Sequence, residues 1–305
     1  MLYLGVDHHK QYSQLVLLNQ AGELLAERRV ANRLESLEEF LGDWEEPVAA
    51  VLEASRSWGN MYDLLEQVSE QVVLAHPWKV RAIPEAQVKT DRVDARVLAH
   101  LLRLDWVPGA YIPPRETREK RNLLRQRIFL VRRRTMVKNR IHVLLDRNHV
   151  PEEEWPQVSD LFGRRGLKFL REVTLSEREG WLLRQELQLL EELNAHIARS
   201  DEAVKRLAQE DPRSAWLQSI PGIGPFFALL LLLEIDTIER FANPAKLVAY
   251  AGLIPSTSAS GGKVYHGRLV YQANRHLRWA FIEIALLAIR SDPDLRAYYE
   301  GLRRR

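Results

Sequence analysis

The sequence of 305 residues predicts a mixed α/β domain followed by two largely helical parts. Up to about residue 103, short apolar runs bounded by turn residues alternate with segments of helical spacing. Beyond residue 115, two long segments keep a helical apolar period, and the sign of the charge changes from block to block. These observations divide the chain into an α/β domain at 1–114, a helical arm at 115–211 and a mostly helical domain at 212–305.

The first domain begins with three strands in a meander. Their ranges are Leu2–Val6, Gln14–Leu18 and Leu24–Val30. A helix over 34–41, a buried strand Val48–Leu52, a helix Met61–Val68, a strand Val72–Ala75 and a helix from Thr90 or Asp91 to about Arg103 follow. This order matches the ribonuclease H-like fold, in which the first and fourth strands are neighbours and the last helix packs across them.

The arm consists of two helices joined by a connector. The first runs from Arg115 to about Asn148 and is ended by Pro151, and the second runs over 176–208 and is ended by Pro212. Each helix carries an apolar stripe, which predicts that the two pack as an antiparallel coiled coil. The third domain is predicted to be mostly helical, with a serine- and glycine-rich loop at 256–262.

Composition excludes several function classes. The chain has no cysteine, which excludes disulfide scaffolds, thiol catalysis and thiolate zinc sites. Its longest apolar run, Phe226–Leu233, is far shorter than the ~20 residues that cross a bilayer, so we expect no membrane partner. Residues 1–7 lack the basic segment and the cleavage site of a signal peptide, which predicts a cytoplasmic location.

Positive charge is concentrated in the first arm helix. Residues 115–149 include 12 basic and 3 acidic side chains, although the net charge of the whole chain is only +3. Such a block predicts a polyanionic partner, and a solvated helix face is the usual alternative. The residues expected to contact a nucleic-acid backbone here are Arg125, Arg132, Arg133, Arg134, Lys138 and Arg140.

Four carboxylates are placed to meet in the first domain. Asp7 ends the first strand and Glu53 ends the fourth, while Asp91 and Asp94 lie one turn apart on one helix face. In the predicted fold the four converge, and such a cluster needs cations because like charges disfavour joint ionisation. Mg²⁺ prefers oxygen ligands, and one or two ions promote phosphodiester cleavage. We therefore predict a Mg²⁺ site formed by these four residues.

Each carboxylate also has a simpler explanation. Asp91 could be only an N-cap, and Asp94 a first-turn acid favoured by the helix dipole. Glu53 could be a solvated strand end, whereas Asp7 directly follows a hydrophobic strand and is harder to explain in this way. If these explanations hold, the protein is a non-catalytic nucleic-acid scaffold.

Three segments resemble the motifs of the DEDD transposases of insertion-sequence family 110. They are Gly5-Val-Asp7, Leu52-Glu53-Ala-Ser55 and Lys89-Thr-Asp-Arg-Val-Asp-Ala95. The N-terminal domain of that family is similar to the RuvC Holliday-junction resolvase. The resemblance implies that Asp7, Glu53, Asp91 and Asp94 bind the divalent ions and are catalytic. We expect Lys89, beside the last motif, to contact nucleic acid.

The third domain resembles the C-terminal domain of the same family. The matching residues are Phe241, Ala249-Tyr-Ala-Gly-Leu-Ile-Pro255, Ser260-Gly261 and Asn274-Arg-His-Leu-Arg278. The resemblance implies that Ser260 is the nucleophile, which forms a phosphoserine link to DNA and so conserves the phosphodiester bond energy. Ser258 is close enough to leave the choice between the two serines open, and polar loop filler is the simpler role of both.

Further phosphate contacts are expected in the third domain. The segment Ser219-Ile-Pro-Gly-Ile-Gly-Pro225 resembles the hairpin of helix-hairpin-helix modules. Backbone N–H groups at Gly222 and Gly224 would suit a phosphate there, although such turns also serve as plain helix connectors. The side chains expected to contact phosphate are Lys263, Arg268, Arg275 and Arg278.

The resemblance also implies partners. These transposases act on target and donor DNA with a structured noncoding guide RNA from their own element, so that base pairing selects the sequence. A homo-oligomer, dimer or tetramer, is implied, in which the carboxylates of one protomer serve the serine of another. A DNA invertase or structure-specific endonuclease without a guide RNA shares the pattern and stays open. A phosphotransferase of the actin-like fold is discounted, because residues 8–13 lack a phosphate loop rich in glycine and threonine.

Overall fold

A computed structural model describes residues 1–55, 57–80, 90–151, 153 and 155–304. Within it the chain forms two compact units, Met1–Ile112 and Pro113–Arg305. The boundary between them lies close to the predicted end of the α/β domain at residue 114. The further division of the second unit at residue 211 remains a prediction.

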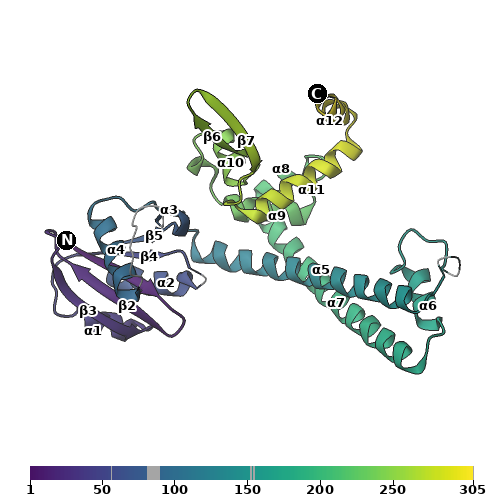
Figure 1. The fold of residues 1–305 in the computed structure, drawn as a ribbon, viewed down its shortest axis with the longest axis horizontal. Helices are drawn as coiled ribbons and strands as arrows, with labels where there is room; N and C mark the ends of the chain where they lie inside the picture. Colours follow the sequence, from purple (N-terminus) through teal and green to yellow (C-terminus); the bar gives the residue numbers. More distant parts are fainter. Residues whose placement is uncertain (56, 81–89, 152, 154, 305) are drawn as a thin grey trace. The chain divides into compact units, whose positions relative to one another are not determined.

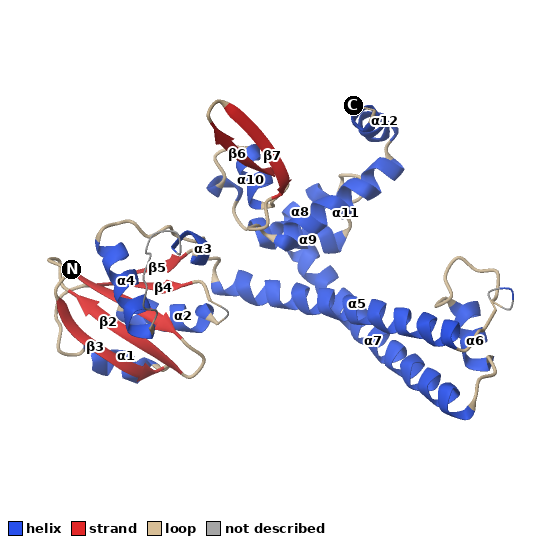
Figure 2. Cartoon of the chain, viewed as in Figure 1, coloured by secondary structure: helices blue, strands red, loops and turns tan. Residues whose placement is uncertain are grey.

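The first unit is built on a five-stranded sheet with the strand order β3-β2-β1-β4-β5 (Figures 1 and 2). The strands are β1 (Leu2–His8), β2 (Tyr12–Leu18), β3 (Leu24–Ala31), β4 (Val48–Glu53) and β5 (Gln71–Ala75). β1 runs antiparallel to β2 and parallel to β4. β2 pairs with β3 in antiparallel fashion, and β4 pairs with β5 in parallel fashion. The predicted pairing of the first and fourth strands is confirmed.

Helices cover both faces of this sheet (Figure 2). α1 (Leu34–Leu41) and α2 (Trp58–Val68) pack against one face, which includes the buried side chains of Leu4 and Val6 on β1. α4 (Asp91–Arg103) crosses β1 and β2 on the other face, and α3 (Pro77–Val80) is a single turn. Because side chains alternate along a strand, Asp7 shares the α4 face of the sheet rather than the α1 face.

The approach of α4 to β1 depends on small residues. A Cβ atom added to Gly5 would collide with the backbone carbonyl oxygen of Ala95 and lie 2.8 Å from the backbone nitrogen of Ala99. Ala95 and Ala99 are fully buried against the strands. Glycine is therefore required at position 5 by the closeness of the helix, and this closeness brings the first turn of α4 to the end of β1.

Two long helices of the second unit pack along each other (Figure 1). They are α5 (Arg115–Arg147) and α7 (Glu177–Glu210), and α6 (Arg164–Glu172) lies in the segment between them. Ion pairs join Arg140 to Glu186 and Arg127 to Asp201, so residue numbers rise along one helix as they fall along the other. The two helices are therefore antiparallel, and apolar side chains such as the fully buried Leu190 line their seam.

Further helices of the second unit follow the arm. They are α8 (Pro212–Gln218), α9 (Pro225–Ile235), α10 (Pro244–Tyr250), α11 (Arg275–Ser291) and α12 (Pro293–Arg303), with a 3-10 turn at Ile238–Arg240. α8 and α11 pack against α9, side chains of α10 join the same core, and α12 packs on α11. α9 contains the longest apolar run of the sequence, and its Ala228, Leu229 and Leu230 are buried in the core of this unit. None of the described helices is long and apolar enough to cross a membrane.

A β-hairpin replaces the predicted loop at 256–262. β6 (Pro255–Ser260) and β7 (Lys263–Leu269) pair in antiparallel fashion around Gly261 and Gly262, whose φ angles are +56° and +75°. Two consecutive residues with positive φ form the tight turn that matches strand twist, and glycine adopts them without strain. The prediction was wrong because every residue of both strands is exposed, so the sequence has no alternation of apolar and polar residues to reveal them.

Candidate metal centre and serine hairpin

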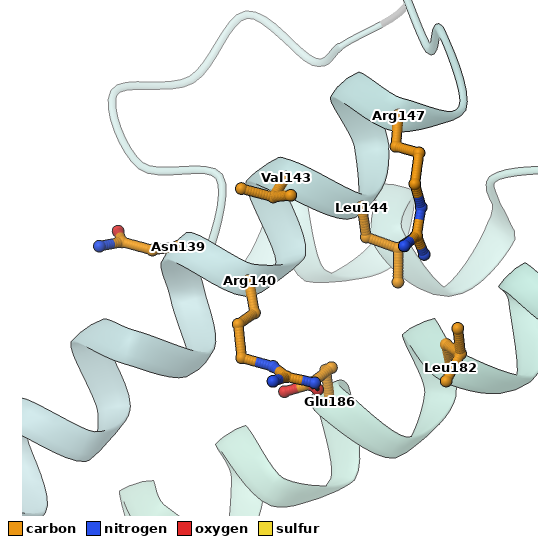
Figure 3. Close-up of a pocket in the computed structure, with 7 residues that line it drawn as sticks. All are labelled: Asn139, Arg140, Val143, Leu144, Arg147, Leu182 and Glu186. Atoms are coloured by element: carbon orange, nitrogen blue, oxygen red, sulfur yellow. Dashed lines mark hydrogen bonds and ion pairs between the residues drawn. The ribbon is translucent and has the colours of Figure 1, made fainter.

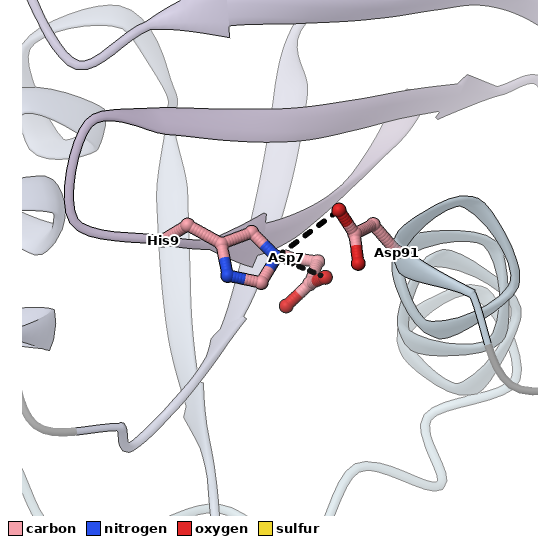
Figure 4. Close-up of side chains that lie close together, drawn as sticks. All are labelled: Asp7, His9 and Asp91. Atoms are coloured by element: carbon pink, nitrogen blue, oxygen red, sulfur yellow. Dashed lines mark hydrogen bonds and ion pairs between the residues drawn. The ribbon is translucent and has the colours of Figure 1, made fainter.

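Asp7 and Asp91 meet at the end of β1, with His9 between them (Figure 4). The Nε2 atom of His9 lies 3.1 Å from Oδ2 of Asp7 and 3.3 Å from Oδ2 of Asp91. One ligand atom from each residue lies within 4.8 Å of the other two. No other trio of histidine and acidic side chains is as close in the part of the chain that the structure describes.

Local structure explains why these side chains converge. Asp7 is the last but one residue of β1, and the chain turns back at once, because the His9 N–H donates to the Tyr12 carbonyl at 2.9 Å. Asp91 is the first residue of α4, and Thr90 before it is the N-cap, whose side chain accepts from the Val93 N–H at 3.3 Å. The Asp91 carboxylate is therefore not the helix cap and is turned toward β1 instead.

Two further side chains hold Asp91 in place. The Tyr12 hydroxyl donates to Oδ2 of Asp91 at 3.1 Å, and a guanidinium nitrogen of Arg29 lies 3.6 Å from the same oxygen. The Arg29 guanidinium also stacks over the Tyr12 ring at 4.1 Å, and the His9 ring packs against that ring with centroids 4.8 Å apart. Sequence reasoning missed His9, Tyr12 and Arg29, the first two because the predicted strands ended at Val6 and resumed at Gln14, whereas the structure extends them to His8 and back to Tyr12.

Burial and the neighbouring charged groups shift the pKa values of Asp7 and Tyr12. Burial raises the pKa of the Asp7 carboxyl, and the charges of Asp91 and Asp94 raise it further against the opposing effect of His9. The hydrogen bond to Asp91 raises the pKa of the Tyr12 hydroxyl. Burial, above all, therefore disfavours the charged form of Asp7, and a bound cation would favour that form.

The other two predicted carboxylates lie near this group but outside the close trio. Asp94 is on the first turn of α4 and acts on Asp7 through its charge. Glu53 ends β4, one residue beyond the register pair Val6–Leu52, and so lies on the strand beside Asp7. Their part in binding an ion remains a prediction.

The donor set suits a divalent cation. Two carboxylate oxygens and an imidazole nitrogen face one another, and their side chains keep 22% (Asp7), 34% (Asp91) and 39% (His9) of their surface exposed. Asp7 is thus largely shielded from water, which strengthens its attraction for a cation, while the group stays accessible to an ion from solvent. Carboxylate and imidazole are both ordinary ligands of divalent metals.

Ser260 lies on the exposed hairpin of the second unit. It is the last residue of β6 and pairs in register with Lys263, the first residue of β7. Ser258 is also exposed and pairs with Tyr265. The hairpin offers both serines to a substrate, so the assignment of the nucleophile to Ser260 remains a prediction.

The two glycines of the predicted phosphate turn differ in their surroundings. Gly222 has a φ of +89°, and a Cβ atom there would lie 2.7 Å from the Ile284 carbonyl oxygen on α11. Gly224 is the N-cap residue of α9, and no atom lies within 4 Å of a Cβ atom added to it. Gly222 is therefore accounted for by packing, whereas the start of α9 at Gly224 is open.

Most of the predicted basic contacts on α5 have partners within the second unit. Arg140 donates to Glu186 at 2.8 Å beside the groove drawn in Figure 3, and Arg134 donates to Asn194 at 3.4 Å. Arg125 donates to Glu234 at 3.0 Å, and Lys138 lies 3.8 Å from Asp160. Neither Arg132 nor Arg133 has an ion pair with a described carboxylate, and Arg133 stacks over the Phe129 ring at 4.8 Å. A role of the six in nucleic-acid binding remains a prediction.

The C-terminal basic residues divide in the same way. Lys263 and Arg268 are exposed on the hairpin, and Arg275 stacks over the Tyr271 ring at 4.6 Å. Arg278 instead donates to two backbone carbonyls, those of Ala251 and Val270, and so fixes the base of the hairpin. Lys89, the one basic contact predicted in the first domain, lies outside the described residues.

A buried polar centre that sequence reasoning missed joins α5, α9 and α11. Glu234 is 2% exposed and accepts hydrogen bonds from Arg125 at 3.0 Å and from Asn274 at 2.8 Å. Arg121 donates to the Leu233 carbonyl at 2.7 Å and lies 3.8 Å from the Glu234 carboxylate. Burial alone would raise the pKa of Glu234, but Arg125, Asn274 and Arg121 together hold it below its usual value. Its partners lie on α5 and at the start of α11, so this carboxylate links α9 to both of those helices.

Comparison with known proteins gives relatives along the whole chain. An insertion-element IS110 protein and a mini-circle putative transposase for IS117, both from Streptomyces coelicolor, are 33% and 36% identical over 33% and 39% of this chain. The matched parts span only 25% and 30% of those two proteins. A probable family 20 transposase of Pseudomonas aeruginosa is 24% identical over 99% of this chain and 89% of its own length.

Two family models match the two ends of the sequence. The model for DEDD transposases of IS110 matches residues 4–150, which include the carboxylate group. The model described as the transposase IS116/IS110/IS902 family matches residues 214–300, which include the serine hairpin. The matched regions keep the order of the two units, and together with the relatives they show that this chain belongs to the IS110/IS116 family of insertion-sequence transposases.

Proposed function

We propose that this protein is the transposase of an insertion sequence, which cleaves and exchanges DNA strands with the help of divalent cations. The observation that carries the proposal is the meeting of Asp7 and Asp91 around His9, in a chain matched by transposase models at both ends. A scaffold with carboxylates that only cap helices would not need this arrangement, because Thr90 already caps α4.

The carboxylates are assigned to the metal. In the proposal Asp7, Glu53, Asp91 and Asp94 hold one or two Mg²⁺ ions. When bound, such ions neutralise phosphate charge and activate an attacking or leaving oxygen. The chain itself supplies the placement, since Tyr12 and Arg29 fix the Asp91 carboxylate before any ion binds.

Ser260 is assigned to the covalent step. Its Oγ forms a bond to a DNA phosphorus while the bond from that phosphorus to a deoxyribose oxygen breaks, and the departing oxygen takes up a proton. The resulting phosphoserine conserves the energy of the phosphodiester bond, so a second strand can displace the serine without a nucleotide cofactor. In the proposal, Lys263 and Arg268, which are exposed on the same hairpin, contact the phosphates.

The partners are target and donor DNA, a structured noncoding guide RNA and further copies of the chain. Base pairing with the guide selects the sequence, while the protein contacts backbone and shape. A dimer or tetramer lets the carboxylates of one protomer serve the serine of another. An invertase or endonuclease that needs no RNA would be favoured if purified protein recombined DNA without any RNA.

The covalent step gives the decisive experiment. The gene with its natural flanking DNA is introduced into cells, and protein bound covalently to DNA is recovered under denaturing conditions. Ser260→Ala is expected to abolish the adduct, because it removes the nucleophilic oxygen, while Ser256→Ala on the same strand is the matched control. If Ser260→Ala forms adducts as the wild type does and Ser258→Ala abolishes them, the nucleophile is Ser258; adducts in both variants would reject the phosphoserine mechanism.

A further inference from the structure

The imidazole of His9 faces two carboxylates with a single nitrogen. Its Nε2 lies 3.1 Å from Asp7 Oδ2 and 3.3 Å from Asp91 Oδ2. One ring nitrogen has either one hydrogen to donate or one lone pair to share, so it can satisfy at most one of the two oxygens well. A metal ion at the centre of the three atoms would be bound by all of them at once.

We propose that His9 is a protein ligand of the metal centre and gives it a preference for transition metals over Mg²⁺. This inference rests on the proposed function, because it concerns the same metal site. It goes further by adding a nitrogen ligand to a site otherwise made of carboxylates. The ion class would then be one that accepts both oxygen and imidazole nitrogen, of which Mn²⁺ and Co²⁺ are examples.

The spacing of the three atoms supports this role. Ligand bonds of about 2.0–2.2 Å put neighbouring ligands of one ion about 2.8–3.6 Å apart, for angles between octahedral and tetrahedral. The two distances from His9 Nε2, 3.1 and 3.3 Å, fall in this interval. The nitrogen is therefore at ligand spacing from both carboxylates, and one oxygen of each carboxylate lies within 4.8 Å of the other.

The neighbouring histidine does not share this position. His8 Nδ1 lies 3.0 Å from the Ser13 hydroxyl and His8 Nε2 lies 3.2 Å from the Ser57 hydroxyl, so both of its nitrogens have partners. His9 is held against the Tyr12 ring, which Arg29 stacks on from further along the chain. The imidazole orientation is thus fixed by packing as well as by the carboxylates, as expected of a preformed ligand.

Imidazole changes the order of metal affinities. Mg²⁺ binds oxygen ligands and gives up its waters reluctantly, so a nitrogen ligand adds little to its affinity. First-row transition metals accept imidazole readily. Removal of His9 is therefore expected to weaken Mn²⁺ binding by about tenfold or more, in line with the effect of losing metal-site groups, and to change Mg²⁺ binding by less than about threefold.

The test uses the purified full-length protein and the metals alone. Binding of Mn²⁺ and of Mg²⁺ is measured by titration calorimetry for the wild type, His9→Ala, His8→Gln and Asp7→Asn. Pulsed electron paramagnetic resonance of bound Mn²⁺ then reports whether a ¹⁴N nucleus is directly coordinated. Thermal unfolding of each variant shows that it is folded. His8→Gln is the matched control, because it changes the adjacent histidine, which faces serines instead of carboxylates.

The outcomes separate this inference from the proposed function. The inference predicts a ¹⁴N signal in the wild type and in His8→Gln, its loss in His9→Ala, and weaker Mn²⁺ binding in His9→Ala. If Asp7→Asn loses metal binding while His9→Ala keeps the wild-type affinity and signal, the metal site stands and the role of His9 is rejected. If Asp7→Asn binds Mn²⁺ like the wild type, the proposed metal site itself fails, and the inference with it.

Discussion

The two units of this protein position their chemistry in opposite ways. In the first unit, regular structure brings the Asp7 and Asp91 carboxylates together, and Tyr12 and Arg29 hold Asp91. In the second unit, Ser260 lies on a two-stranded hairpin on which every residue is exposed. Two-stranded hairpins are marginal in water without packing. The contrast indicates that the Asp7–Asp91 group is already arranged within its unit, whereas the hairpin has no buried side chain that would fix Ser260.

The sharpest test of this contrast is Asp7→Asn, which we expect to lower strand cleavage about 10³-fold. Its stability should not fall. Burial and neighbouring acids raise the pKa of Asp7, so in metal-free protein its charged form opposes folding at neutral pH, and a neutral amide removes that opposition. Cleavage in cells and the thermal midpoint of the purified protein are both measured, with the exposed Asp43→Asn as control. A thermal midpoint so low that Asp7→Asn is unfolded in cells would explain the lost cleavage and would assign Asp7 to folding.

The second unit depends on its buried centre instead. Glu234→Ala leaves Arg121, Arg125 and Asn274 without their carboxylate and should cost about 3–5 kcal/mol of unfolding free energy. Urea denaturation measures this cost. Glu300→Ala on α12, an exposed site, is the control and should change the free energy by less than about 0.5 kcal/mol. A cost below about 1 kcal/mol for Glu234→Ala would mean that the three helices are held by apolar packing alone.

The same carboxylate predicts a dependence on pH. Its partners hold the pKa of Glu234 below the ordinary value of 4.5, so its contribution is complete above that value and is lost as the pH falls through the lower, folded pKa. Glu234→Gln lacks the titrating group. The stability of the wild type should therefore fall more steeply than that of Glu234→Gln between about pH 5 and pH 3. Parallel curves in urea titrations at these pH values would contradict the assignment.

Packing at Gly5 offers a smaller and more local test. Gly5→Ala drives a methyl group into the Ala95 backbone, so α4 must move away from β1 at a cost of about 1–3 kcal/mol. Because Asp91 starts α4, affinity for Mn²⁺ should also fall. Gly109→Ala, in the same unit, has no atom within 4 Å of the new methyl and should leave both properties unchanged. Wild-type metal affinity in Gly5→Ala would show that the start of α4 is not fixed by this contact.

The sequence predicts those parts of the fold and the site that depend on short patterns of neighbouring residues. The strand before Asp7 and the helix after Thr90 follow from short patterns, and the topology then places the two acids together. His9 and Tyr12 were missed because their role arises from the register between β1 and β2, which no periodicity reveals. Glu234 was missed for a related reason, since its partners on α5 lie more than 100 residues away in the chain.

Charge patterns were the least informative part of the sequence. The excess of lysine and arginine on α5 predicted a free basic face, yet Arg127 and Arg140 pair with acidic residues of α7. Acidic residues of α7 therefore neutralise part of the positive charge of α5 across their interface. A run of one charge therefore predicts an external partner only after the neighbouring element has been identified.

The smallest expected effect is a difference in stability between two glycine substitutions in the second unit, one at a packed position and one at an exposed position. Gly222 and Gly262 both have positive φ, +89° and +75°, so alanine strains either position by about 1 kcal/mol. At Gly222 the new methyl also meets the Ile284 carbonyl oxygen, whereas at Gly262 nothing lies within 4 Å. Gly222→Ala should therefore lower the thermal midpoint by several degrees. Gly262→Ala should leave the midpoint unchanged and raise amide exchange about fivefold across Pro255–Leu269, because an unpacked hairpin opens without unfolding the unit. An equal fall of the midpoint in both variants would mean that the hairpin is part of the folded core, and that Ser260 is held as firmly as the carboxylates.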